Sequence, residues 1–132
     1  MLLLVMMLKN AKHTIPEPTL KLIFNSHLQT HLEDQPIVYT DGSKTKDGVA
    51  FAIAGYKQRR TFASESRKIR NEASIFTAEL YAILLAVQRT RHFDNQDVTI
   101  ISDSKSSIQA ITNTYSKNSI VNLIKERIYE ID

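Results

Sequence analysis

Apolar and polar residues follow two different periods along this chain, and the change between them predicts a mixed α/β domain. Short β-rich runs occur at residues 37–40, 48–55 and 61–66, with turn-forming residues between them. The run GVAFAIAG at 48–55 is apolar on both faces, which is typical of a central strand. We therefore expect an antiparallel meander of three strands, with the first strand ending at the turn-like residues 41–43.

The second half of the chain has a helical period. Residues 74–91 are the best predicted helix, because apolar side chains recur there at i, i+3, i+4 and i+7, at Leu80, Ile83, Leu84 and Val87. A β-rich run at 97–101, a short helix at 104–114 and a helix at 119–131 follow. We expect the strand at 97–101 to lie parallel to the strand at 37–40, joined to it by a right-handed crossover.

The N-terminal segment carries weaker signals. Residues 1–18 end in Pro-Glu-Pro and are expected to be a tail or linker, and the domain is expected to cover residues 19–132, beginning with an amphipathic helix at 19–32. His27 and His31 lie four apart on that helix, but no third ligand is near, so surface histidines are favoured over a metal site. The apolar run at 2–8 is too short to span a bilayer and lacks the features of a signal peptide. We expect an intracellular protein, in the cytoplasm or nucleus, without a membrane partner.

Three acidic residues stand beside the predicted elements. Asp41 and Asp103 follow strands that end at 40 and 101, and Glu79 lies in the first turns of the helix at 74–91. The carboxyl ends of adjacent parallel strands meet at one edge of a sheet, and the helix packs across that sheet, so the three carboxylates should converge. Oxygen ligands of this kind suit Mg²⁺, which points to metal-assisted phosphodiester chemistry.

Each acid also has an ordinary structural interpretation. Asp41 precedes a glycine and could be a turn residue, Asp103 could cap a helix, and Glu79 could favour the helix dipole. Together, in this order and on these elements, the three acids favour the metal site.

Composition and charge fit this hypothesis. The 132 residues contain no cysteine, which excludes disulfides and thiolate metal sites, and 42% are hydrophobic, enough for one packed core. The net charge is +3. Six basic residues concentrate between 57 and 70, either as a solvated hairpin surface or as a basic flank that holds a polyanionic duplex beside the acids: Lys57, Arg59, Arg60, Arg67, Lys68 and Arg70.

The motifs YTDGSK at 39–44, TAEL at 77–80 and SDS at 102–104 resemble those of the ribonuclease H family. The sequence around these motifs is most similar to ribonuclease H domains of non-LTR retrotransposons, which lie beside a reverse transcriptase in a polyprotein. The resemblance covers residues 35–131. In related integrase and transposase domains the glutamate comes last, whereas here it lies between the two aspartates, which favours the nuclease branch.

The resemblance implies a ribonuclease H-like mixed sheet with flanking helices, and an enzyme that hydrolyses the RNA strand of an RNA–DNA hybrid to leave a 5′-phosphate. Asp41, Glu79 and Asp103 would be the catalytic residues and would bind two Mg²⁺ ions, with Mn²⁺ as a substitute. Gly42 and Ser43 would lie under the hybrid, and Thr77 and Ser104 would contact its sugar-phosphate backbone. The 2′-hydroxyl would distinguish RNA from DNA.

One departure leaves an alternative open. Members of the family continue with a last strand, a loop histidine and a final helix that carries a fourth acidic ligand, and we expect these to be absent here, which leaves a sheet edge unpaired. The alternative is a catalytically defective remnant that binds hybrid without turnover. A flavodoxin-like binding module is disfavoured, because no glycine-rich phosphate loop follows the first strand.

Overall fold

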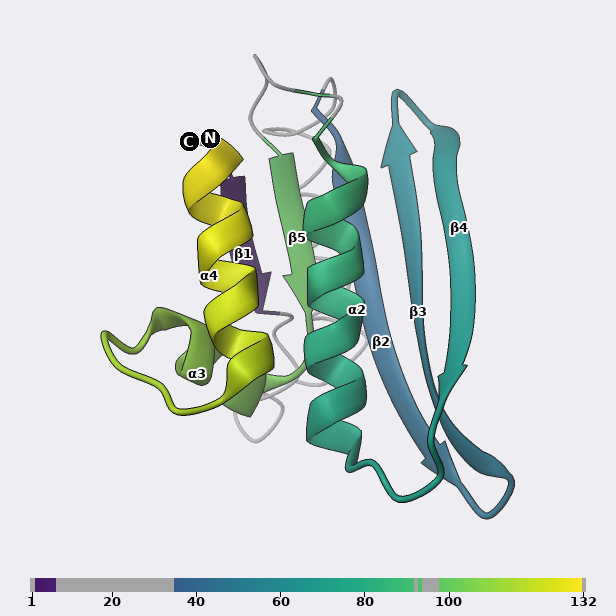
Figure 1. The fold of residues 1–132 in the computed structure, drawn as a ribbon. Coiled ribbons are helices and arrows are strands. Elements are labelled where there is room, and N and C mark those ends of the chain that lie inside the picture. Colours follow the sequence, from purple (N-terminus) through teal and green to yellow (C-terminus); the bar gives the residue numbers. More distant parts are fainter. Residues whose placement is uncertain (1, 7–34, 92, 94–97, 132) are drawn as a thin grey trace, which may run out of the picture.

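The computed structural model describes residues 2–6, 35–91, 93 and 98–131. Five strands form one sheet in the order β1-β5-β2-β3-β4 (Figure 1). Strands β2 (Ile37–Thr45), β3 (Gly48–Lys57) and β4 (Arg60–Ile69) form the antiparallel meander, and β5 (Val98–Ser102) runs parallel to β2. The predicted mixed sheet, with three antiparallel strands beside a parallel one, is confirmed.

The fifth strand, β1 (Leu2–Met6), was not expected. It pairs in parallel with β5, from Leu2 opposite Val98 to Met6 opposite Ser102. These residues come from the segment that we expected to be a tail or linker, and they cover the edge of β5 that we expected to be unpaired. The run LLLVM has no alternation that separates a strand from a tail, and its partner begins only at Val98, so the pairing was not visible in the local sequence.

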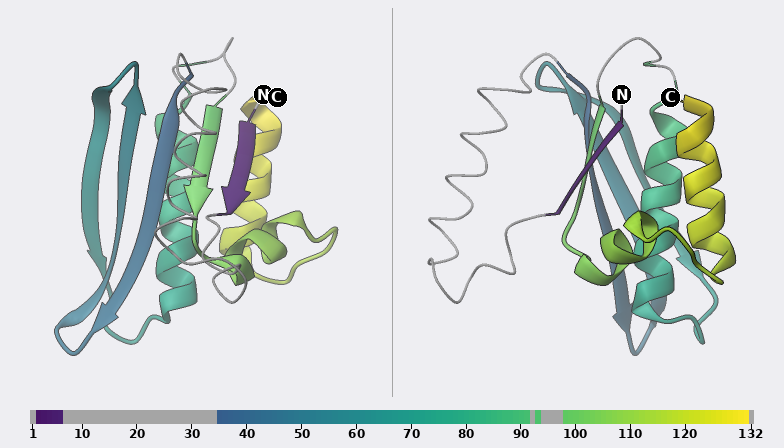
Figure 2. Two further views of the ribbon diagram at one scale, coloured as in Figure 1. Left: turned by 180° about the vertical axis from the view of Figure 1, so that it is seen from behind. Right: turned by 90° about the vertical axis from the view of Figure 1, so that its left-hand side faces the viewer.

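The described helices lie on one face of the sheet (Figure 2, right). They are α2 (Ile75–Arg89), α3 (Lys105–Thr112) and α4 (Ser119–Ile131), each within two residues of its predicted bounds. The helix predicted at 19–32, with His27 and His31, lies outside the described residues. Within the described ranges, no helix has the length and apolar character that crossing a bilayer requires.

The core lies between α2 and the strands beneath it. Alternation in β3 turns Val49, Phe51 and Ile53 toward the helices, where all three are buried, and leaves Ala50, Ala52 and Ala54 on the opposite face. The apolar stripe of α2 covers them, with Leu80, Ile83 and Val87 fully buried. The large hydrophobic contact area of this layer fixes α2 over the sheet.

Strand β2 is longer than predicted. The ladder with β3 continues through Asp41, Gly42 and Ser43 as far as Thr45, which pairs with Gly48, so the turn lies at residues 46 and 47. The expectation that β2 turns at Asp41-Gly42-Ser43 was therefore wrong. Gly48 directly follows this turn and has a φ of 141°, a conformation that favours glycine. The glycine therefore suits the position where the chain leaves the turn and enters β3.

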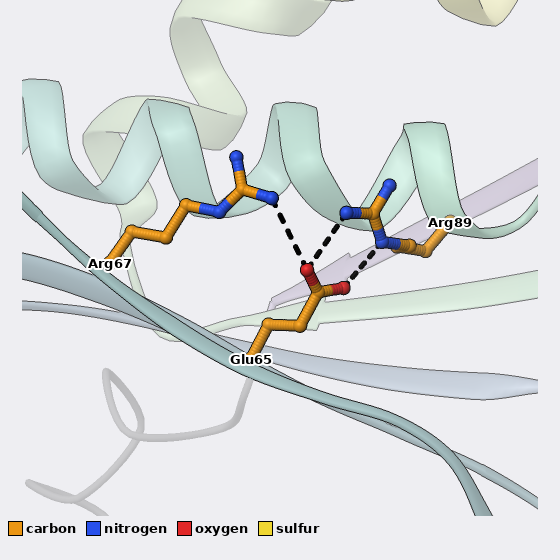
Figure 3. A network of polar contacts seen from close by, with 3 residues as sticks. All are labelled: Glu65, Arg67 and Arg89. Atoms are coloured by element: carbon orange, nitrogen blue, oxygen red, sulfur yellow. Dashed lines mark hydrogen bonds and ion pairs between the residues drawn. The ribbon is translucent and has the colours of Figure 1, made fainter.

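A polar network joins the C-terminal end of α2 to the edge strand β4 (Figure 3). The Glu65 carboxylate on β4 accepts hydrogen bonds from Nε and Nη2 of Arg89 on α2, the latter at 2.8 Å, and from Nη2 of Arg67 at 3.3 Å. The Arg89 guanidinium lowers the pKa of Glu65, chiefly through its hydrogen bond, and Glu65 in turn raises the pKa of Arg89. The network links the last turn of α2 to β4, in addition to the hydrophobic contacts of the core.

Candidate metal centre

Asp41 lies where β2 and β5 diverge. The parallel ladder between these strands ends at Tyr39 opposite Ile101, and Asp41 is the second residue beyond it. Between them, the buried Thr40 donates a hydrogen bond from Oγ1 to the Ile101 carbonyl oxygen at 3.1 Å. We predicted that Asp41 follows the end of its strand, but it lies inside β2, beside the end of β5. The Thr40 hydrogen bond sets the spacing between β2 and β5 at that point.

Glu79 lies one turn inside the start of α2. The helix begins after Ser74, whose hydroxyl accepts a hydrogen bond from the Thr77 amide at 3.1 Å. Gly42 allows α2 to approach β2 here, since a Cβ at Gly42 would lie 2.7 Å from the Glu79 backbone nitrogen. The glycine that follows Asp41 thus brings the backbone of Glu79 against the strand that carries Asp41.

Asp103 follows β5 directly. Its two serine neighbours hold the connection between strand and helix: the Ser104 amide donates to Ser102 Oγ at 3.0 Å, and Ser104 Oγ accepts from the Ser107 amide at 3.3 Å. Ser104, not Asp103, is thus the N-cap of α3. The Asp103 side chain is half-buried at the strand end.

The three carboxylates meet. One oxygen from each of Asp41, Glu79 and Asp103 lies within 4.8 Å of the other two. Asp41 is exposed and Asp103 is half-buried, whereas Glu79 is only 7% exposed. Three negative charges so close repel one another, and hard oxygen donors open to solvent on one side fit a divalent cation such as Mg²⁺ or Mn²⁺. The convergence predicted from the sequence is present.

The four predicted substrate contacts lie around this centre, and three of them already have structural partners. Gly42 is buried against α2, Thr77 Oγ1 lies 3.0 Å from Ser74 Oγ at the helix start, and Ser104 caps α3. Ser43 is exposed, on the face of the sheet away from α2. Their contacts with a nucleic acid stay predictions, and Gly42 has a reason to be glycine that requires no substrate.

The basic segment at 57–70 does not form one flank. Lys57, Arg59 and Arg60 lie at the β3–β4 turn, where Lys57 pairs with Arg60. Strand spacing puts this turn about 20 Å from Asp41. Lys68 and Arg70 lie at the other end of β4, on the side of the β2–β3 turn. The interpretation of all six residues as one flank beside the acids was therefore wrong, because a ten-residue strand separates its two halves.

Thr40 is the positioning residue that the sequence analysis missed. The alternation of β2 gives a signal for it, because Val38 and Thr40 occupy the face that is buried under α2. A hydroxyl on a core-facing position needs a hydrogen-bond partner, and here that partner is the Ile101 carbonyl oxygen, near the end of the neighbouring strand β5. Which strand lies beside β2 depends on the crossover connection between β2 and β5, so the residues around Thr40 alone do not predict it.

Comparison with known proteins shows which family and which solved structures this chain is similar to. The RNase H family model matches residues 33–129. RNase H1 from the halophilic archaeon Halobacterium salinarum NRC-1 is similar, with 19% identity and a TM-score of 0.57, over 74% of this chain and 76% of that one. LC11-RNase H1, isolated from compost by a metagenomic approach, gives 19% identity and a TM-score of 0.57, over 74% and 75% of the two chains.

A structure of LC11-RNase H1 in complex with an RNA/DNA hybrid gives a TM-score of 0.58 at 19% identity, again over 74% of this chain and 75% of that one. No curated protein sequence matches. At such identities the structures show a shared fold, and the family match, which covers most of the chain and contains all three acids, agrees with it. The chain belongs to the RNase H family.

Proposed function

We propose that this protein is a metal-dependent endonuclease that hydrolyses the RNA strand of RNA–DNA hybrids. The observation that carries the proposal is the convergence of Asp41, Glu79 and Asp103 from a strand, a helix and a strand end to within 4.8 Å. Membership of the RNase H family, and the RNA/DNA hybrid bound by one structural neighbour, support the choice of substrate.

The three carboxylates would hold divalent cations, Mg²⁺ or Mn²⁺, which supply an activated water and charge stabilisation for phosphodiester cleavage. The water oxygen would bond to phosphorus while the bond from phosphorus to the 3′-oxygen breaks. The products would be a 3′-hydroxyl and a 5′-phosphate. Glu79 is buried, and the backbone of α2 comes close to β2 at Gly42. Both features would keep the three carboxylates in a fixed arrangement, on which phosphoryl chemistry depends.

Exposed and half-buried groups around the carboxylates would contact the substrate. Ser43 lies two residues beyond Asp41 and is open to solvent, and Thr77 and Ser104 flank the two other ligands. The similarity of IVYTDGSK, SIFTAELYAIL and SDSKSSIQAI to retrotransposon domains supports a place beside a reverse transcriptase in a polyprotein.

The test is strand-selective cleavage. The protein is incubated with Mg²⁺ and four labelled substrates: an RNA–DNA hybrid, duplex RNA, duplex DNA and single-stranded RNA. We expect cutting of the RNA strand of the hybrid only, with 5′-phosphate ends, and no cutting by the Asp41→Asn variant. Hybrid binding without cleavage would favour the defective remnant, and equal cleavage by Asp41→Asn would remove Asp41 from the site.

A further inference from the structure

The short strand β1 ends beside Asp103. It runs parallel to β5, so both strands end at the edge of the sheet where the carboxylates meet (Figure 1). We propose that β1 is a positioning element of the metal centre, because its pairing with β5 fixes the strand end from which Asp103 extends. The inference rests on the cation site within the proposed function, and it gives residues 2–6 a role in that site.

The position of Asp103 depends on neighbouring elements more than the positions of the other two acids do. Asp41 lies inside β2, where it is paired with Ala52 of β3, and Glu79 is buried inside a helix of 15 residues. Asp103, in contrast, is the first residue after β5. A residue beyond the end of a strand is held only as firmly as that strand end and the connection that follows it.

Pairing on the β2 side of β5 stops short of this strand end. The ladder between β2 and β5 covers three residues of β5 and ends at Ile101, whose carbonyl oxygen also accepts the hydrogen bond from Thr40. The ladder between β1 and β5 covers all five residues of β5, and its last pair is Met6 with Ser102. Among the described strands, β1 alone therefore pairs with the residue that precedes Asp103.

Strand β1 also contacts the segment on the other side of Asp103. Helix α3 begins two residues after Asp103, at Lys105, and its residues contact β1. Neighbouring strands lie about 4.8 Å apart, so the backbone of Met6 lies one strand spacing from that of Ser102. The connection that carries Asp103 is thus held by β1 at the strand before it and at the helix after it.

This arrangement predicts that loss of β1 weakens cation binding through Asp103. A divalent cation needs its oxygen ligands at closely defined distances, and a frayed strand end would spread Asp103 over several positions. Groups that support a metal ligand without contacting the ion contribute about 10- to 100-fold in affinity. Because binding and pairing are then coupled, the cation should in turn strengthen the pairing of β1 with β5.

The experiment uses the double variant Leu3→Pro/Leu4→Pro in the full chain, here called the proline pair. Successive N–H groups of a strand point to opposite sides, so the proline pair removes a donor to β5 whichever residue carries it. Leu3→Val/Leu4→Val is the matched control, because it keeps both N–H groups and favours a strand. Phe62→Ala removes a ring that contacts Phe93 near the β3–β4 turn, and it controls for a general loss of stability.

Mn²⁺ affinity is measured by electron paramagnetic resonance, at a temperature where circular dichroism shows each variant to be folded. We expect the proline pair to bind Mn²⁺ roughly tenfold more weakly than the parent chain, and both controls to bind it as the parent does. In an Asp103→Asn background, the proline pair should cause no further loss, because β1 acts through Asp103.

Hydrogen exchange of the parent chain supplies a second measurement that does not depend on the folding of a variant. Exchange of the amides in residues 2–6 should slow when Mg²⁺ is added, since pairing of β1 and cation binding support each other. If the proline pair does not fold, this measurement decides alone.

Three results would overturn the role of β1 alone: a folded proline pair that binds Mn²⁺ as the parent does, an equal loss in Phe62→Ala, or the same further loss in the Asp103→Asn background. Unchanged exchange in residues 2–6 while Mg²⁺ binds would also overturn it. A parent chain that binds no cation would overturn both the metal centre and this role. A parent chain that binds Mn²⁺ as predicted but cuts no hybrid would contradict only the proposed catalysis.

Discussion

At the scale of single residues, small side chains around the acids determine where the acids lie. Gly42 lets the α2 backbone come within contact distance of β2, and Thr40 bonds β2 to the end of β5. Both flank Asp41 in the sequence. The motif TDG thus combines one of the three converging acids with the two residues that position its strand against the elements of Glu79 and Asp103.

Replacing Thr40 tests this positioning role. Thr40→Val keeps the shape but removes the donor to the Ile101 carbonyl, so we expect a loss of about 1–2 kcal/mol in the free energy of unfolding. We also expect weaker Mn²⁺ binding, because Asp41 and Asp103 lose the bond that fixes their spacing. Denaturant unfolding and calorimetric titration measure the two effects.

Thr40→Ser is the matched control, because it keeps the hydroxyl and loses only a methyl group. It should retain Mn²⁺ affinity even if it lowers stability. If both variants bind Mn²⁺ as tightly as the parent chain, Thr40 supports the fold without positioning the site.

At the scale of elements, the sequence predicted the helices better than the ends of the strands. The helix at 119–131 was placed at its observed bounds, because its apolar period is regular. Strand β2 was predicted too short, because the sequence Asp-Gly-Ser is typical of turns when it is considered alone. In the structure, pairing of Asp41 with Ala52 and of Ser43 with Ala50 keeps this segment extended. Pairing between distant residues decides such a segment, and local propensity does not reveal it.

The link between α2 and β4 predicts a pH dependence. The Arg89 guanidinium lowers the pKa of Glu65 in the folded chain, below its ordinary value of 4.5. The ion pair therefore stabilises the fold above pH 4.5, and this contribution is lost as the pH falls through the lowered pKa. Because the Glu65 and Arg89 side chains are 27% and 36% exposed, the contribution at neutral pH is roughly 0.5–1 kcal/mol.

The measurement is urea unfolding of the parent chain and Glu65→Gln at several pH values. We expect Glu65→Gln to be less stable at pH 7 and the difference to shrink below pH 4.5, where the parent carboxyl also becomes neutral. Glu126→Gln, on an exposed position of α4, should show no such trend. A difference that does not change with pH would mean that packing, and not charge, links α2 to β4.

At the scale of the whole molecule, the architecture around the three acids could be read from the sequence, while its edges could not. The order of strand, helix and strand with an acid on each was sufficient to predict convergence, because parallel strands joined by a crossover share an edge. Pairing of β1 with β5, and the separation of Arg59 and Arg60 from Lys68 and Arg70, depend on the sheet as a whole. Neither leaves a local trace in composition or periodicity.

The most direct test of the account is whether the three carboxylates act as one cation site. Thermal unfolding is followed with and without Mg²⁺ for the parent chain and for Asp103→Asn. Removing one of three mutually repelling charges should raise the melting temperature in the absence of metal. In the parent chain, Mg²⁺ at ten times its dissociation constant should add about 1.4 kcal/mol, or roughly 3–6 °C.

We predict that Asp103→Asn loses most of this Mg²⁺-dependent rise while starting from a higher melting temperature without metal. An equal rise in the two chains, or none in the parent chain, would contradict the claim that Asp41, Glu79 and Asp103 form one metal centre.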